Sequence, residues 1–103
     1  MIRKAGETKL KKYWYCLLGK ELYVYKSKNE DKHKGMHNLI GVFIKDEPQE
    51  KLNGEVTLYP FKLIFPPNKV RVYYLESEKE KKQWMDAIKK VIGYSNLFDF
   101  YDI

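Results

Sequence analysis

The chain has 103 residues, of which 44% are hydrophobic and 33% charged, and its net charge of +6 comes from 20 basic and 14 acidic residues. This length suits one domain with a modest core, and the single cysteine, Cys16, excludes an internal disulfide. No apolar run approaches the roughly 18 residues of a membrane span, and the N-terminal MIRKAGE lacks the apolar segment of a signal peptide, so we expect a cytoplasmic protein.

Short strand-forming segments fill the first three quarters of the chain. Residues 13–18 form a dense aromatic and apolar run, and residues 21–26 alternate as the returning strand of a hairpin after the break at Gly19. A polar loop is predicted at residues 27–37. The remaining predictions are strands at 39–44, at 55–59 and 61–65 on either side of Pro60, and at 70–75, a loop at 45–53, and a turn at Pro66-Pro67-Asn68-Lys69.

After residue 76 the apolar period changes to that of a helix. Ser77 and Glu80 have the spacing of a capping box, which predicts a helix that begins just after Ser77. Gly93 is a natural C-cap. One helical face carries the apolar stripe of Trp84, Ala87, Ile88, Val91 and Ile92. Many short strands followed by one amphipathic helix predict a bent antiparallel sheet or partly open barrel that the helix covers at one end.

The order and spacing of these segments resemble those of a pleckstrin homology (PH) domain over about residues 2–93. The resemblance implies a mainly β fold, a seven-stranded antiparallel barrel capped by one C-terminal helix, with the domain at residues 1–93 and a linker or the start of a following domain at 94–103. The matching segments are Ile2-Arg3-Lys4-Ala5-Gly6, Lys11-Lys12-Tyr13-Trp14-Tyr15-Cys16-Leu17, Leu22-Tyr23-Val24-Tyr25, residues 70–77, and residues 78–92 with Trp84.

The excess positive charge lies in the N-terminal part of the chain. Residues 1–45 hold 11 basic and 4 acidic residues, whereas residues 46–103 hold 9 and 10. Such polarity orients a protein toward anions, among them an anionic membrane, a nucleic acid or an acidic protein face. Single-strand nucleic-acid binders also combine aromatic with basic residues, but the chain has only 2 Arg beside 18 Lys, so we expect no nucleic-acid partner.

The resemblance implies a site for phosphoinositide headgroups at the mouth of the barrel, between the first two strands. Lys4 and Lys11 match two positions of the family's phosphate-binding pattern, but Tyr13 stands where that pattern has Arg, and Val24 stands where high-affinity members have Tyr. A Tyr cannot grip a phosphate with two parallel N–H groups as Arg does, so we expect binding mainly through charge. The candidate phosphoinositide-binding residues are Lys4, Lys9, Lys11, Lys12, Tyr13, Lys32 and Lys34.

No pattern in the sequence indicates catalysis, a cofactor or a metal. His33 and His37 are four residues apart, but four converging ligands are not evident. Acidic residues are plentiful without a pair placed for acid–base chemistry, and the sequence has no GxSxG, HExxH or Gly-rich phosphate loop. We therefore expect a non-enzymatic, monomeric binding module.

The last ten residues lie outside the resemblance to a PH domain. Phe100-Tyr101-Asp102-Ile103 is similar to the segment that leads into the first strand of protein kinases of the calcium/calmodulin-dependent type. This similarity implies a module that recruits or regulates a larger signalling protein, here a kinase, at the membrane periphery. The alternative is a protein-interaction or autoinhibitory module in which lipid is incidental.

Overall fold

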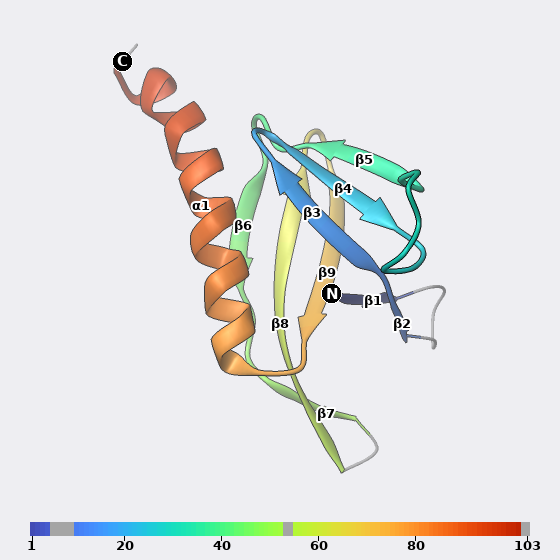
Figure 1. Cartoon of the computed structure of the whole chain (residues 1–103). Helices are drawn as coiled ribbons and strands as arrows, with labels where there is room; N and C mark the ends of the chain where they lie inside the picture. The colour runs from blue at the N-terminus through green and yellow to red at the C-terminus, as the bar shows by residue number, and fades with distance from the viewer. Residues whose placement is uncertain (5–9, 53–54, 102–103) are drawn as a thin grey trace.

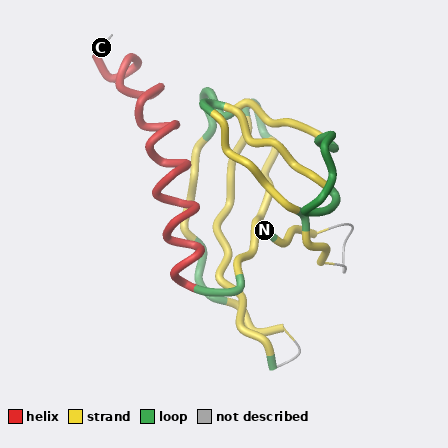
Figure 2. The backbone as a smooth tube through the Cα atoms, viewed as in Figure 1, coloured by secondary structure: helices red, strands yellow, loops and turns green. Residues whose placement is uncertain are grey.

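The computed structural model describes residues 1–4, 10–52 and 55–101, and in these ranges it contains nine short strands and one long helix (Figures 1 and 2). All strand pairs are antiparallel. The elements are β1 (Ile2–Lys4), β2 (Leu10–Lys12), β3 (Trp14–Leu18), β4 (Glu21–Tyr25), β5 (Gly35–Asn38), β6 (Phe43–Asp46), β7 (Glu50–Leu52), β8 (Val56–Phe65), β9 (Lys69–Leu75) and α1 (Glu78–Tyr101).

The strands form two sheets, with α1 along one side (Figure 1). One sheet has the order β2-β1-β9-β8-β6, with β7 also paired to β8, and the other has the order β3-β4-β5. Only Tyr13 separates β2 from β3, and only residues 47–49 separate β6 from β7. If each of these two pairs is counted as one bent strand, the nine segments reduce to seven, so the predicted fold class is confirmed.

The core lies between the two sheets and the inner face of α1. On β4 the side chains alternate, so that Leu22 and Val24 are buried. Phe61 of β8 stacks on Tyr73 of β9 with ring centroids 5.7 Å apart, and neither has exposed surface. The helix contributes the buried side chains of Met85, Ile88 and Ile92, which confirms the helical periodicity of the sequence.

A buried turn replaces the first part of the strand predicted at residues 39–44. Gly41 has a φ of 77°, and the amide of Ile40 donates a hydrogen bond of 2.8 Å to Oδ1 of Asn38. Leu39 and Val42 are fully buried within this turn. Their apolar character therefore reflects burial of a turn rather than a strand, and β6 begins at Phe43. The predicted loop at residues 27–37 is also too long, because β5 begins at Gly35.

Pro60 does not divide β8 into two strands as predicted. In the register, β7 pairs with β8 up to Leu58, and β6 pairs with it from Phe61 onward. Pro60 therefore lies between the segments that pair with β7 and with β6. Its missing N–H costs no hydrogen bond to either of these two strands. The predicted loop at 45–53 accordingly contains the end of β6 and all of β7.

The N-terminus of α1 forms as predicted, but its C-terminus does not. The amide of Glu80 donates a 3.1 Å hydrogen bond to Oγ of Ser77, which confirms Ser77 as the N-cap. Gly93 lacks the positive φ of a C-cap, and the helical backbone continues to Tyr101. A glycine inside a helix costs only about 1 kcal/mol relative to alanine, so it does not oblige the helix to end.

Ion pairs fix the first turns of α1 to the end of β6. Nζ of Lys81 pairs with the Asp46 carboxylate and donates a 2.8 Å hydrogen bond to the carbonyl of Glu47. The Glu47 carboxylate lies 2.9 Å from Nζ of Lys62. Hydrogen bonding to these ammonium groups lowers the pKa of Asp46 and the pKa of Glu47 below their ordinary values of 3.8 and 4.5.

Because the pKa values of these two carboxylates are lowered in the folded protein, we expect the protein to lose stability in acid. Because their pKa values are lower in the folded state, the unfolded chain binds more protons as the pH falls below about 5, and stability decreases through that range. We expect the Asp46→Asn/Glu47→Gln variant to show a smaller decrease in thermal midpoint than the wild type over the same pH series. Asp86→Asn on α1 is the control and should keep the wild-type slope; equal slopes for all three proteins would contradict this prediction.

Candidate anion-binding site

Tyr13 occupies the point at which the chain passes from one sheet to the other, between β2 and β3. Its backbone amide donates a 2.9 Å hydrogen bond to the carbonyl of Met1. The Tyr13 side chain is 4% exposed. Tyr13 is therefore held firmly from the backbone and its ring is largely covered.

Two lysines from distant parts of the chain meet over this ring. Nζ of Lys34 donates a 3.2 Å hydrogen bond to the hydroxyl of Tyr13 and lies 4.4 Å from the ring centroid. Nζ of Lys11 lies 5.6 Å from the same centroid. The Lys34 amide also donates a 2.6 Å hydrogen bond to the carbonyl of Val24, which positions the end of the β4–β5 loop. Both contacts between ammonium group and ring have cation–π geometry.

Neither Lys11 nor Lys34 belongs to an ion pair in the part of the chain that the structure describes. Each ammonium group has three N–H donors, and the hydrogen bond to Tyr13 uses one of those of Lys34. The Lys11–Lys34 site, as we name this pair above Tyr13, therefore presents two positive charges and several N–H donors at one place. Phosphate groups bind well to positive charges that also offer N–H donors.

The other lysines predicted for the site are placed differently. Lys12 lies 2.8 Å from the Glu76 carboxylate, and this partner raises the pKa of Lys12 and lowers that of Glu76. Successive residues of a strand point to opposite faces, so Lys11 and Lys12 cannot both reach Tyr13. Lys32 is exposed in the β4–β5 loop, two residues before Lys34. Lys4 pairs in register with Leu10, whereas Lys9 lies outside the described residues.

The register reveals a basic position that the sequence analysis did not include. Arg3 of β1 is the cross-strand partner of Lys11 on β2. The sequence analysis selected Lys4 by its place in the family pattern. An explicit pairing of the first two strands could have identified Arg3.

The two histidines do not converge on a common point. His33 packs edge-on against Tyr23 and Tyr25, with centroids 5.0 and 6.3 Å apart. His37 packs against Phe65 at 5.5 Å. Each imidazole is thus part of a separate aromatic contact.

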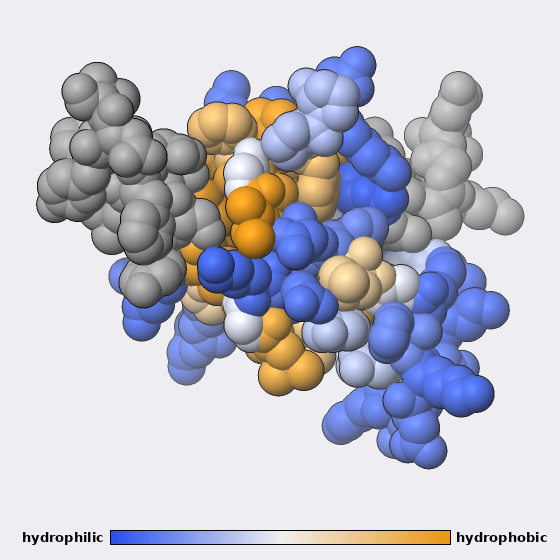
Figure 3. Space-filling model, turned by 90° about the horizontal axis from the view of Figure 1, so that it is seen from above, coloured by the Kyte–Doolittle hydropathy of each residue, from blue (hydrophilic) through white to orange (hydrophobic). Residues whose placement is uncertain are grey.

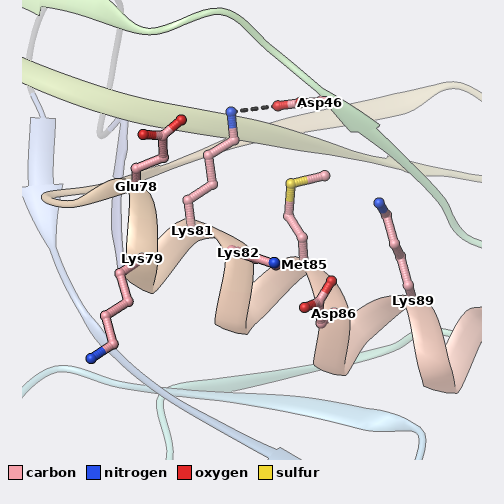
Figure 4. A pocket seen from close by; sticks show the side chains of 8 residues that line it. All are labelled: Asp46, Glu78, Lys79, Lys81, Lys82, Met85, Asp86 and Lys89. Carbon is pink, nitrogen blue, oxygen red and sulfur yellow. Dashed lines mark ion pairs between the residues drawn. The ribbon is translucent and has the colours of Figure 1, made fainter.

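A groove between α1 and β6 is a second candidate for ligand binding (Figure 4). It has a volume of about 570 Å³, and the buried side chain of Met85 contributes to its lining. Figure 4 shows Lys81 directed at Asp46, with which it is paired. The charged residues around the groove have both signs and are Asp46, Glu78, Lys79, Lys81, Lys82, Asp86 and Lys89. This near balance makes the groove a weaker anion site than the Lys11–Lys34 site.

Comparison with known proteins agrees with the fold and defines the class of protein. The family model of the PH domain matches residues 1–93. A PH domain-containing protein of Dictyostelium discoideum is 32% identical over 80 residues, which cover 75% of this chain and 16% of that relative. The chain therefore belongs to the PH domain family, whose members are non-catalytic modules for lipid or protein binding in signalling.

The chain corresponds to only a small part of this relative, as the 16% coverage states. Among the residues that the structure describes, no helix is both long enough and apolar enough to cross a bilayer.

Proposed function

We propose that the chain binds the phosphoinositide headgroups of an anionic membrane and thereby recruits or regulates a larger signalling protein. The observation that carries this proposal is the meeting of Lys11 and Lys34 above Tyr13. We add Lys32 of the β4–β5 loop, which is exposed and two residues before Lys34. We assign Lys4 and Lys9 to the same site, with Tyr13 as the platform that supports the two ammonium groups.

Charge rather than close fit dominates this binding. A lysine near an anionic leaflet contributes about 1 kcal/mol, so a few lysines give useful recruitment without a tightly shaped pocket. The β4–β5 loop also carries Glu30 and Asp31, which reduce its net positive charge. Lys12 contributes less than its neighbours, because Glu76 already compensates its charge. We therefore expect moderate affinity and modest discrimination among phosphoinositides.

Vesicle binding tests this proposal. The protein is mixed with vesicles of phosphatidylcholine alone, with added phosphatidylserine, or with added polyphosphoinositide, and the bound fraction is measured by sedimentation. We expect binding to increase in that order and to decrease steeply with salt, because exposed charges are screened. Equal binding to all three vesicles, or binding to none of them, would contradict the proposal.

A role in contacting a neighbouring domain is the second candidate. It is favoured by the small share of the Dictyostelium relative that this module covers, because the rest of such a protein offers surfaces to bind. The kinase connection suggested by the last four residues stays a prediction. A Gly-x-Gly-x-x-Gly sequence within about ten residues after Ile103 would support it. In this role, reversing the charge of Lys11 and Lys34 should leave binding to the neighbouring domain intact.

A further inference from the structure

The outer face of the β3–β4–β5 sheet is unusually apolar. The register pairs Trp14 with Tyr25, and Cys16 with Tyr23, which in turn pairs with Met36. Alternate residues of these strands face inward, and among them Leu22 and Val24 are buried. We call the apolar and aromatic outward side chains the aromatic face; they are Trp14, Cys16, Leu18, Tyr23, Tyr25 and Met36. Glu21 and Asn38 are on the same side of the sheet at the end near Leu18.

A face of this kind is normally polar. In an antiparallel sheet with one side against the core, the other side usually carries hydrophilic residues. Here Trp14 is 37%, Met36 44% and Leu18 59% exposed. None of the outward residues that the register pairs in these strands is a lysine, although the chain has 18. Contiguous exposed apolar side chains of this kind mark interaction surfaces.

One end of the aromatic face adjoins the Lys11–Lys34 site. Trp14 pairs with Tyr25, and the amide of Lys34 donates a hydrogen bond to the carbonyl of Val24, the residue before Tyr25. On the other side His33, which stands between Lys32 and Lys34, packs against both Tyr23 and Tyr25. In Figure 1 this sheet lies in front of β8 and β9, so α1 does not cover its outer side.

The far end of the aromatic face differs in charge. Leu18 pairs with Glu21, which accepts a 2.9 Å hydrogen bond from the hydroxyl of Tyr23. Near this end Lys20 and Lys90 line one hollow with Gly19, and Glu21 is the acidic residue beside them. The face therefore has a more basic end at Trp14, near Lys11, Lys32 and Lys34, and a less basic end at Leu18. Figure 3, coloured by hydropathy, shows a dense group of hydrophilic residues on the side away from α1, with hydrophobic residues reaching the surface elsewhere.

We propose that the basic end of the aromatic face, with Trp14 and Tyr25, enters the interfacial layer of the bilayer whose headgroups occupy the Lys11–Lys34 site. This inference rests on the proposed function. Trp and Tyr combine an apolar ring with a polar group and are enriched at the membrane–water interface. Lysines beside them attract the anionic leaflet. The domain then lies tilted on the membrane, with Leu18 outside the bilayer.

A bilayer fits this surface better than a protein partner does. Both would cover exposed aromatic residues, but a protein partner on the whole face would also bury Leu18, the most exposed member. More lysines adjoin the Trp14 end than the Leu18 end, so a flat anionic surface attracts the Trp14 end more strongly. A bilayer should cover Trp14 and leave Leu18 exposed, whereas a protein partner on the whole face should cover both, so the two residues distinguish a bilayer from a protein partner.

Trp14 fluorescence is the test. The intact chain is bound to polyphosphoinositide vesicles that contain lipids brominated at shallow or deep acyl positions, and tryptophan emission is recorded. Trp14→Phe leaves Trp84 as the one tryptophan and so supplies the signal to subtract. We expect blue-shifted Trp14 emission that shallow bromines quench more than deep bromines. Absence of quenching on vesicles that the protein does bind would overturn the inference and leave the proposed function intact.

Two alanine variants add an independent readout. Trp14→Ala should weaken vesicle binding about tenfold without changing its salt dependence, because it removes apolar contact and no charge. Leu18→Ala should bind as the wild type does. If both variants weaken binding equally, or if either changes the oligomeric state in sedimentation velocity without vesicles, the face is a protein interface and the inference is wrong. If the wild type binds no vesicle, both this inference and the proposed function fail.

Discussion

Reversing the charge of Lys11 and Lys34 together should weaken binding to polyphosphoinositide vesicles about a thousandfold. Each Lys→Glu change removes one positive charge and adds one negative charge, so the double variant loses about 4 kcal/mol of attraction to an anionic leaflet. The fold should tolerate the change, because both ammonium groups lie above Tyr13 and not in the core. Vesicle sedimentation measures the binding to vesicles, and urea unfolding measures the stability of the fold.

The matched control reverses two lysines on the opposite side of the molecule. Lys79 and Lys82 of α1 are exposed and border the groove of Figure 4. Lys79→Glu/Lys82→Glu makes the same change in net charge, so any effect of overall charge appears equally in both variants. We expect the α1 variant to keep most of its vesicle binding. Equal losses would show that net charge, and not the Lys11–Lys34 site, is responsible.

Phe61→Ala should reduce the free energy of unfolding by about 3–5 kcal/mol, a large part of the total stability of a small domain. Phe61 has no exposed surface and stacks on Tyr73, which packs edge-on against Tyr15 at 5.6 Å. Removing this ring opens a cavity where the two sheets meet. The change is measured by urea unfolding.

Phe43→Ala is the control for this substitution. Phe43 belongs to β6, which pairs directly with β8, but its side chain is 62% exposed. The same atoms are deleted from the same sheet without opening a cavity, so we expect a change within about 0.5 kcal/mol. A loss at Phe43 comparable with that at Phe61 would mean that the assignment of the core is incorrect.

Features that depend on neighbouring residues were predictable from the sequence. The cap at Ser77, the apolar stripe of α1 and the β3–β4 hairpin each follow from local spacing. The turn at residues 39–42 was not predictable from the sequence, because its apolar residues are buried by the rest of the fold. The continuity of β8 through Pro60 was also not predictable, because it depends on where β6 and β7 pair with that strand.

The candidate site divides in the same way. Its positive charge was evident from the sequence, but the meeting of Lys11 with Lys34 depends on how two distant segments pack around Tyr13. The different place of Lys12 follows from strand alternation and could have been predicted from its position next to Lys11. The ion pair of Lys12 with Glu76 could not have been predicted from the sequence, because the two residues are 64 positions apart.

An NMR titration with a soluble polyphosphoinositide headgroup tests the central claim most directly. If Lys11 and Lys34 form one anion site on Tyr13, the largest shift changes should fall on the amides of these three residues and of Lys32, and should saturate with one common affinity. Changes confined to the lysines of α1, or separate affinities for Lys11 and Lys34, would show that the two cations do not act as a single site.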